Sequence, residues 1–169
     1  MFKKYFLSII CLFTLINCGY IRMPKDEYGE PNLNEKVKYN FVEMPSKDDF
    51  NKIDTTAYYI QVFEGRYYNE TEKENPQIII FHNDGFFKKE ILSTFKKNDL
   101  HRNRNSIYYG GKYRIKGNII ELEEFFPSTG GKTNYYVRNI SKGKIDSNKI
   151  FFGNEKQSVT VFERKQKLE

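Results

Sequence analysis

Short apolar or alternating runs, separated by turn residues, make up most of the chain after residue 53. The clearest alternation is at 112–116, where Tyr113 and Ile115 each lie between two cations. A period of two is typical of a β-strand with one buried face, so these two side chains are expected to face a core. We predict about eight strands from nine such runs, over 55–63, 77–82, 85–91, 107–116, 118–126, 133–140, 143–145, 149–152 and 158–164.

The same alternation predicts which face of each strand is buried. Glu121 and Glu123 fall on the outward phase of their run, and we expect them to lie opposite Lys or Arg on a neighbouring strand. The runs 58–60 and 78–81 are apolar on both faces, which predicts that the lead-in segment or a partner covers their outer side. The inward positions expected in other runs are Ile120, Leu122, Ile150, Phe152, Val159 and Val161.

The connections between most runs are short. The turns at 83–85 and 116–118 each contain glycine, which accepts a positive φ and favours a hairpin. Parallel pairing needs crossovers of a dozen residues or more, which these turns do not provide. We therefore predict an all-β fold, an antiparallel up-and-down meander of about eight strands. Closure into a small barrel is expected because it removes exposed strand edges.

The segment before the predicted barrel differs in composition and in hydrophobic pattern. Residues 18–52 contain three prolines and dense charge with little apolar periodicity, which is typical of a tether and lead-in. Ser46 and Asp49 have the spacing of a capping box and predict one short helix over 46–52. The rest is expected to space the barrel domain, predicted over 53–165, from its attachment point.

Composition supports the sheet prediction. The chain has 15 Phe and 13 Tyr but a single alanine, Ala57. Aromatic and β-branched residues suit a pleated surface, and the scarcity of strong helix formers argues against a helical bundle. The aromatic content, with a net charge of only +6, also argues against a disordered chain.

The N-terminus has the three parts of an export signal. Lys3 and Lys4 form a positive region, a mostly apolar run covers 5–16, and small residues follow. A membrane-spanning helix needs about 20 apolar residues, which is longer than this run. We therefore expect residues 1–17 to be a signal peptide that the mature protein lacks.

The four residues Leu15-Ile16-Asn17-Cys18 resemble the lipobox of bacterial lipoproteins. The resemblance implies that Cys18 becomes the first mature residue, carries acyl chains and attaches the protein to a membrane of the cell envelope. Gly19 then implies the outer membrane. An ordinary secretory signal with an incidental cysteine, or an uncleaved anchor, are the alternatives. If Cys18 is acylated and Cys11 leaves with the signal, no thiol remains for a disulfide or a nucleophile.

Turn and strand signatures over 54–164 resemble a known family. The hairpin Ile80-Phe81-His82-Asn83-Asp84-Gly85-Phe86 is followed by Gly110-Gly111-Lys112-Tyr113-Arg114-Ile115-Lys116-Gly117-Asn118-Ile119-Ile120. This order is similar to that of the small lipocalin-like (calycin-like) lipoproteins of bacteria. The resemblance implies a small antiparallel barrel, and most members of the family have no defined activity.

A catalytic set is hard to assemble from this sequence. His82 near Asp84 could orient a base, but a surface turn explains both residues, and His101 lies in a charged stretch. Glu121, Glu123 and Glu124 have the residue type of a glycosidase pair, yet alternation explains them as strand positions. Metal-ligand spacings and phosphate-binding glycine loops are absent. We expect no enzyme, no cofactor and no metal.

Positive charge is concentrated in one stretch. Residues 84–116 contain nine Lys or Arg and three acids, a net +6, whereas the chain without Lys3 and Lys4 carries +4. Such asymmetry can attract anionic lipid head groups, acidic glycans or an acidic protein, and export argues against nucleic acid. A solvated loop is the alternative. The candidate patch comprises Lys96, Lys97, Arg102, Arg104, Lys112 and Arg114.

Aromatic residues suggest a second site. Tyr58, Tyr113, Ile115 and Tyr135 lie on predicted strands and could line a cavity for a small apolar ligand. The alternative is that they only fill the core. Two functions therefore stay open. One is a non-enzymatic, lipid-anchored binding module for a small apolar or anionic ligand. The other is a structural, interaction or inhibitor lipoprotein with a solid barrel that binds another envelope protein.

Overall fold

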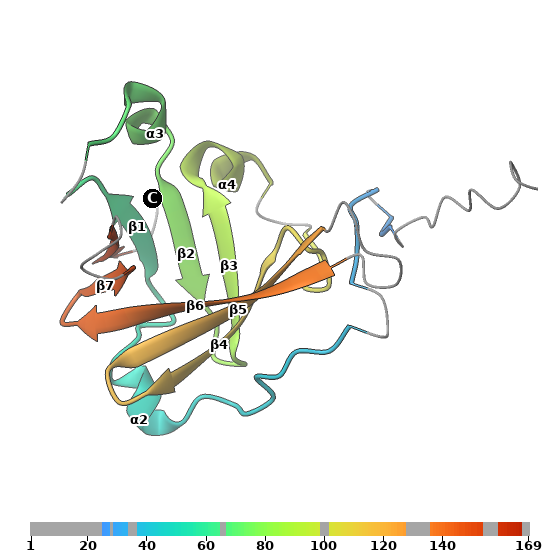
Figure 1. Cartoon of the computed structure of the whole chain (residues 1–169), viewed down its shortest axis with the longest axis horizontal. Coiled ribbons are helices and arrows are strands. Elements are labelled where there is room, and N and C mark those ends of the chain that lie inside the picture. Colours follow the sequence, from blue (N-terminus) through green and yellow to red (C-terminus); the bar gives the residue numbers. More distant parts are fainter. Residues whose placement is uncertain are drawn as a thin grey trace, which may run out of the picture.

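The computed structural model describes residues 25–27, 29–33, 37–64, 67–98, 102–127, 136–153 and 159–166. They form a closed antiparallel barrel in which each strand pairs with the next and β1 pairs with β8 (Figure 1). This confirms the all-β meander. The strands are β1 (Tyr58–Val62), β2 (Gln77–Phe81), β3 (Phe86–Ile91), β4 (Gly110–Lys116), β5 (Ile119–Pro127), β6 (Tyr136–Asp146), β7 (Lys149–Phe152) and β8 (Thr160–Lys165).

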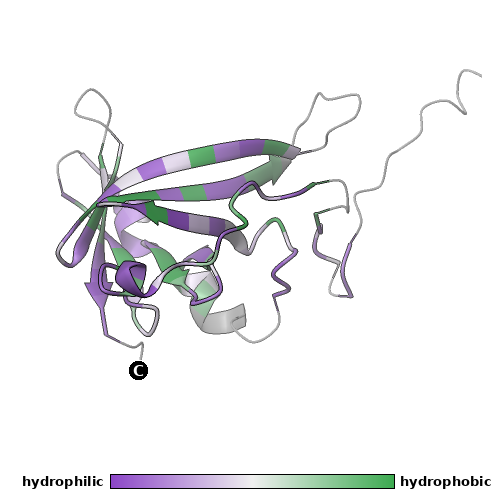
Figure 2. Ribbon diagram, turned by 90° about the horizontal axis from the view of Figure 1, so that it is seen from below, coloured by the Kyte–Doolittle hydropathy of each residue, from purple (hydrophilic) through white to green (hydrophobic). Residues whose placement is uncertain are grey.

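One half of the barrel is packed with large apolar side chains. Tyr113 and Phe81 meet edge to face with ring centroids 5.0 Å apart, and Tyr59 makes a similar contact with Phe81 at 5.3 Å. We call this half the base; it lies toward the 82–85, 116–118 and 146–148 turns. Ile53, which follows the predicted helix and is not part of a strand, packs into the core of the base. The bands of contrasting hydropathy along the strands reflect the two faces (Figure 2).

The register confirms most predicted inward positions and corrects one strand. Ile120, Leu122 and Ile150 belong to the base core, and Phe152 packs against it. In β8, however, Phe162 lies opposite Ile150 and faces inward, so Val161 faces outward. The prediction that Val159 and Val161 face the core was therefore wrong. The run from 159 to 162 is apolar in both phases, and alternation alone cannot choose between them.

Three short helices accompany the strands in the part of the chain that the structure describes. The predicted helix is α2 (Lys47–Phe50), with the expected capping box between Ser46 and Asp49. The helices α3 (Glu70–Glu74) and α4 (Leu92–Asn98) lie between predicted strand runs, where no helix was expected. Among the described residues, none of the helices has the length and apolar character needed to cross a membrane.

Part of the lead-in lies along the outside of the barrel rather than away from it. We call residues 37–45 the strap. The carboxylate of Glu123, on the outer face of β5 and fully buried, accepts hydrogen bonds from the backbone N–H groups of Asn40 and Phe41 at 2.8–2.9 Å. The Phe41 ring lies against Arg114, with its centroid 4.1 Å from the guanidinium carbon. The strap thus covers part of the outward face of β4 and β5, to which Arg114 and Glu123 belong.

The segment before the strap lies at the other end of the barrel. Residues 25–33, blue in Figure 1, contact the first part of β6 and the loop before β4. The Tyr136 hydroxyl donates to the carbonyl of Asn32 at 2.6 Å, and Asn32 also bridges to Ser106. From there the strap runs down the barrel to α2 and the base. The described chain therefore enters the domain at the end opposite the base, which we call the mouth.

Candidate ligand pocket at the barrel mouth

The barrel wall opens at the mouth between β3 and β5. Strand β4 pairs with β3 only from Lys88 to Phe86, so the last residues of β3 extend beyond it. Two glycines allow β4 to enter this narrow space. A Cβ at Gly110 would lie 2.3 Å from the Phe87 carbonyl oxygen, and one at Gly111 would lie 1.9 Å from that of Glu123. Any side chain at either position would push the neighbouring backbone away.

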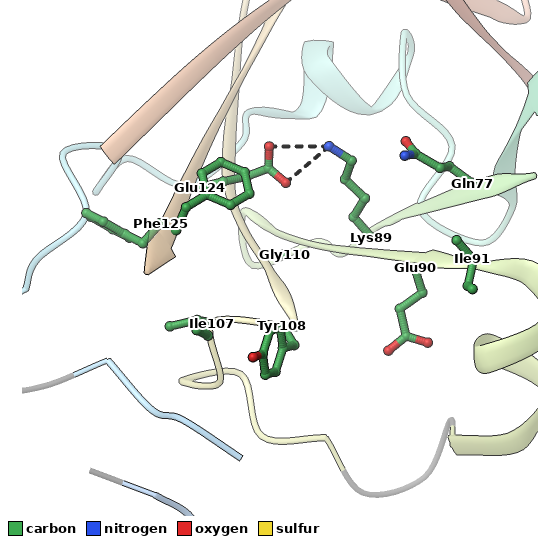
Figure 3. Close-up of a pocket in the computed structure, with 10 residues that line it drawn as sticks. Gln77, Lys89, Glu90, Ile91, Ile107, Tyr108, Gly110, Glu124 and Phe125 are labelled. Atoms are coloured by element: carbon green, nitrogen blue, oxygen red, sulfur yellow. Dashed lines mark hydrogen bonds and ion pairs between the residues drawn. The ribbon is translucent and has the colours of Figure 1, made fainter. Parts of the chain in front are cut away.

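A pocket of about 400 Å³ occupies this opening (Figure 3). This volume lies within the range of small-molecule sites. The end of β3, the loop before β4 and the end of β5 supply most of the wall. Its lining residues are Gln77, Lys89, Glu90, Ile91, Ile107, Tyr108, Gly110, Glu124, Phe125 and Phe126.

An ion pair lies at the inner side of the pocket. Lys89 is the register partner of the core residue Ile79, so its side chain points into the barrel. Its Nζ donates to both carboxylate oxygens of Glu124, at 3.3 and 3.4 Å (Figure 3). The Lys89 side chain remains 30% exposed, whereas that of Glu124 is 7% exposed. The pair therefore presents mainly its cationic half to an entering molecule.

A smaller cavity continues from this ion pair into the barrel. Its volume is about 110 Å³, and Gln77 and Lys89 line both spaces. Its wall mixes apolar and polar residues at the same levels, because Ile79 pairs with Lys89, Leu122 with Ser141 and Phe152 with Thr160 in the register. The remaining lining residues are Ile79, Leu122, Ser141, Phe152, Thr160 and Phe162. Polar side chains thus enter the barrel interior next to the apolar core of the base.

Glu90 occupies the other face of β3, and Figure 3 shows it leaving the strand away from Lys89. Its Oε1 forms an ion pair with Arg102, and the Lys88 ammonium lies 4.0 Å away. Arg102 also donates to Glu30 of the N-terminal segment at 2.9 Å. The Glu90 Oε2 is buried without a hydrogen-bond partner among the described atoms. This network ties the loop before β4, and with it one pocket wall, to the N-terminal segment.

Exposed apolar side chains surround the opening. Phe126 and Val137 are cross-strand partners at the ends of β5 and β6, and both are about half exposed. Ile91 ends β3, and Tyr108 lies in the loop before β4. The exposed fractions of these four residues run from 41% to 55%. We call them the apolar rim.

The cavity residues predicted from sequence do not meet at this pocket. Tyr58 precedes the inward-facing Tyr59 and therefore points to the outer face. Tyr113 is a fully buried part of the base, and Ile115 packs against the same core. Tyr135 lies outside the described residues. Both described inward residues fill the core, as the alternative interpretation held.

The predicted anionic-partner patch is largely neutralised within the fold. Arg102 pairs with Glu30 and Glu90, Arg104 with Asp84, and Arg114 with Glu121. The Lys112 ammonium lies 4.9 Å from the centroid of the Phe86 ring. The side chains of Lys96 and Lys97 are outside the described part of the structure. The described arginines therefore stabilise loop, strand and strap contacts, and only one described cation, Lys89, lines the mouth pocket.

The candidate catalytic groups are also placed by structural contacts. The His82 Nε2 lies 2.8 Å from the Tyr109 hydroxyl, and Asp84 pairs with Arg104 rather than with the histidine. His101 and Cys18 lie outside the described residues. Where the structure describes side chains, no three His, Cys, Asp or Glu groups gather in a way that could hold a metal ion.

Glu121 and Glu123 meet the basic neighbours that alternation predicted. Glu121 binds Lys142 at 2.9 Å and Arg114 at 2.5 Å, and Glu123 binds Arg138 at 2.8 Å. Hydrogen bonding to Lys142 and then to Arg114 lowers the pKa of Glu121 despite its burial. Desolvation by burial, in contrast, raises the pKa of the Tyr113 hydroxyl in the base.

Sequence reasoning did not identify Lys89 or Glu124 as a pair. Glu124 lies two residues after Leu122 and therefore faces inward as Leu122 does. A carboxylate at an inward-facing strand position is the sequence signal that could have identified it. Lys89 likewise shares the phase of Phe87. The two residues are 35 positions apart, and only the barrel register brings them together. No family model, curated protein or solved structure matches the chain.

Proposed function

We propose that this chain is a lipid-anchored lipoprotein of the bacterial cell envelope whose barrel binds a small ligand without catalysing a reaction. The observation that supports this most is the pocket of about 400 Å³ at the barrel mouth, with an apolar rim and one ion pair. Apolar walls with a few converging polar groups are typical of ligand sites. The anchor is acylated Cys18, and the outer membrane is the proposed location.

The charge arrangement favours a ligand with an apolar body and an anionic group. Glu124 is almost fully buried and already engaged, whereas the Lys89 ammonium retains exposure toward the pocket. A carboxylate or phosphate on the ligand can therefore approach Lys89 without first displacing Glu124. The apolar rim would contact the ligand body.

The first experiment is native mass spectrometry of the full chain purified from bacterial membranes. The proposal predicts acyl mass on Cys18 and a co-purifying small molecule. A dansylated eleven-carbon fatty acid then serves as the probe in a fluorescence titration. We expect Lys89→Gln to weaken probe binding about tenfold, since a hydrogen bond to a charged group contributes about 1.5–3 kcal/mol.

Lys142→Gln is the matched control, because Lys142 lies on the outer face of β6 and pairs with Glu121. It should leave probe affinity unchanged. Equal affinities for wild type and Lys89→Gln, or no binding of the probe, would contradict the ligand proposal.

The second candidate is a structural or inhibitor lipoprotein that binds another envelope protein. Two observations favour it: the solid base, and the exposed side chains of Val42 and Met44 on the strap, 71% and 63% exposed. Exposed apolar groups are a common part of protein interfaces. A chain that is acylated, carries no co-purifying molecule and does not bind the probe would favour this alternative.

A further inference from the structure

The end of the barrel that the anchor can reach is fixed by the path of the described chain. Lys25 pairs with Pro31, and the Pro31 carbonyl accepts the backbone N–H of Ile107 at 3.1 Å. Ile107 lines the mouth pocket. The chain that leads to the acylated Cys18 therefore enters the described domain beside the pocket wall.

The length of chain before Lys25 limits how far the mouth can be from the membrane. Six residues separate Cys18 from Lys25 in the sequence. The seven Cα–Cα steps span at most about 25 Å when fully extended. A barrel strand such as β5, from Ile119 to Pro127, is of similar length at about 3.3 Å per residue. The anchor can thus hold the mouth against the bilayer, whereas placing the base there would require the chain to run back along the whole barrel.

The side chains at the two ends fit this orientation. The apolar rim exposes Ile91, Tyr108, Phe126 and Val137 at the mouth. The turns at the base expose mainly polar groups, among them Lys116, Asn118, Asp146 and Ser147. The exposed apolar side chains nearest to these turns, Val42 and Met44, belong to the strap beside Gly85. An aliphatic and aromatic surface is favoured at the boundary of lipid head groups and acyl chains, and tyrosine suits that boundary because its ring is apolar and its hydroxyl polar.

We infer that the mouth of the barrel docks on the phospholipid bilayer, with the apolar rim inserted among the lipid head groups. The inference rests on the proposed acylation of Cys18. In this orientation the 400 Å³ pocket opens toward lipid rather than toward bulk water. The expected ligand is then an amphiphile that passes from the bilayer into the pocket. Its anionic group would contact Lys89.

The test measures which end of the barrel touches lipid. Val137→Cys at the rim and Ile119→Cys at the base are matched variants, since their native side chains are 55% and 40% exposed. Each full-length acylated protein is labelled with an environment-sensitive nitrobenzoxadiazole thiol reagent and reconstituted in phosphatidylethanolamine and phosphatidylglycerol vesicles. Acylation of the Cys18 sulfur and loss of Cys11 with the signal leave the introduced thiol as the single reactive one. Tyr108→Cys is the second rim variant if Val137→Cys does not fold.

At the rim we expect a blue-shifted emission, a several-fold rise in intensity and quenching by doxyl-labelled lipid, with none of these at residue 119. An acylated protein with equal or stronger quenching at residue 119 would overturn the docking orientation and leave the anchor and the ligand pocket standing. A wild-type chain with no acyl mass and a free, reactive Cys18 would overturn the anchor and the orientation together.

Discussion

The two ends of this barrel are built on the same hydrogen-bonded ladder but are filled in opposite ways. At the base, the inward positions are large and apolar, and Tyr113, Phe81 and Phe87 leave no room for a ligand. At the mouth, the inward positions of the same strands include Lys89 and Glu124. Strand pairing thus gives the barrel its closure, whereas the choice of inward side chain decides where it is solid and where it is hollow.

The pairing itself also differs between the ends. At the base, β3 and β4 are in register down to Phe86 and Lys112. At the mouth, β4 begins at Gly110, so the last residues of β3 have no β4 partner and the pocket occupies the resulting opening. A pocket in a small barrel therefore does not need a wider barrel. It needs one strand that starts late and inward side chains that do not fill the space.

The largest expected effect is a difference in unfolding free energy between a substitution in the base and one at the mouth. Phe81→Ala in the base should lower the free energy of unfolding by about 3–5 kcal/mol, because it removes a fully buried ring and leaves a cavity. Phe126→Ala at the rim, where the ring is 46% exposed, should lower it by less than about 1 kcal/mol. Urea unfolding followed by far-UV circular dichroism measures both. Similar losses would contradict the distinction between a solid base and an open mouth.

The next comparison uses two adjacent carboxylates that point to opposite faces of β5. Glu123→Ala should cost about 2–4 kcal/mol of unfolding free energy, because Asn40, Phe41 and Arg138 lose a buried acceptor. Glu124→Ala should cost less, since Lys89 is partly exposed and can be hydrated at the mouth. Hydrogen exchange should show that only Glu123→Ala loses protection at residues 40 and 41. Unchanged protection there would show that the carboxylate does not hold the strap.

A smaller effect is expected from one hydroxyl in the base. Tyr113→Phe removes the hydrogen bond that the Tyr113 hydroxyl donates to the His82 carbonyl at 2.8 Å. The loss should be about 1 kcal/mol, the usual contribution of a neutral hydrogen bond. Tyr108→Phe at the rim, half exposed in the native fold, should leave the thermal midpoint within error. A larger shift in Tyr108→Phe than in Tyr113→Phe would reverse the comparison.

The smallest effect is a dependence on pH. The pKa of Glu121 is lowered by Lys142 and Arg114, so its pairing stabilises the fold above the carboxyl's unfolded pKa and is lost as pH falls through the lowered folded value. Glu121→Gln should therefore lose less stability than wild type on acidification from pH 6 to pH 3. At neutral pH it should be less stable by about 1 kcal/mol or less. Parallel slopes for the two proteins would contradict this assignment.

Sequence periodicity predicted the strands well where one phase is apolar and the other charged. At 112–116 every side chain takes the predicted face, because a shift of one residue would bury the cations. The prediction was wrong at Val161 because Val161 and the adjacent Phe162 put one apolar side chain in each phase of β8. The helix α4 was not expected since its sequence, Leu-Ser-Thr-Phe-Lys-Lys-Asn, lacks a distinct capping signal and spans only about two turns.

The candidate site could not be predicted in the same way. Alternation placed Glu123 outward correctly, but it contains no information about the strap, whose contact residue Asn40 lies 83 positions earlier. The pocket depends on the difference in length between β3 and β4 and on which inward residues meet across the barrel. Both are properties of pairing between distant segments, whereas composition and local pattern report only on one segment at a time.

The pairing of β1 with β8 also determines when, during synthesis of the chain, the barrel can close. Strand β1 (Tyr58–Val62) can pair with its second neighbour, β8 (Thr160–Lys165), only after the ribosome has synthesised β8. Until then β1 and its partner β2 present an open edge, and contacts between such distant segments form slowly. The final six-residue strand therefore controls when the domain stops being a target for proteases and for pairing with other unfinished chains.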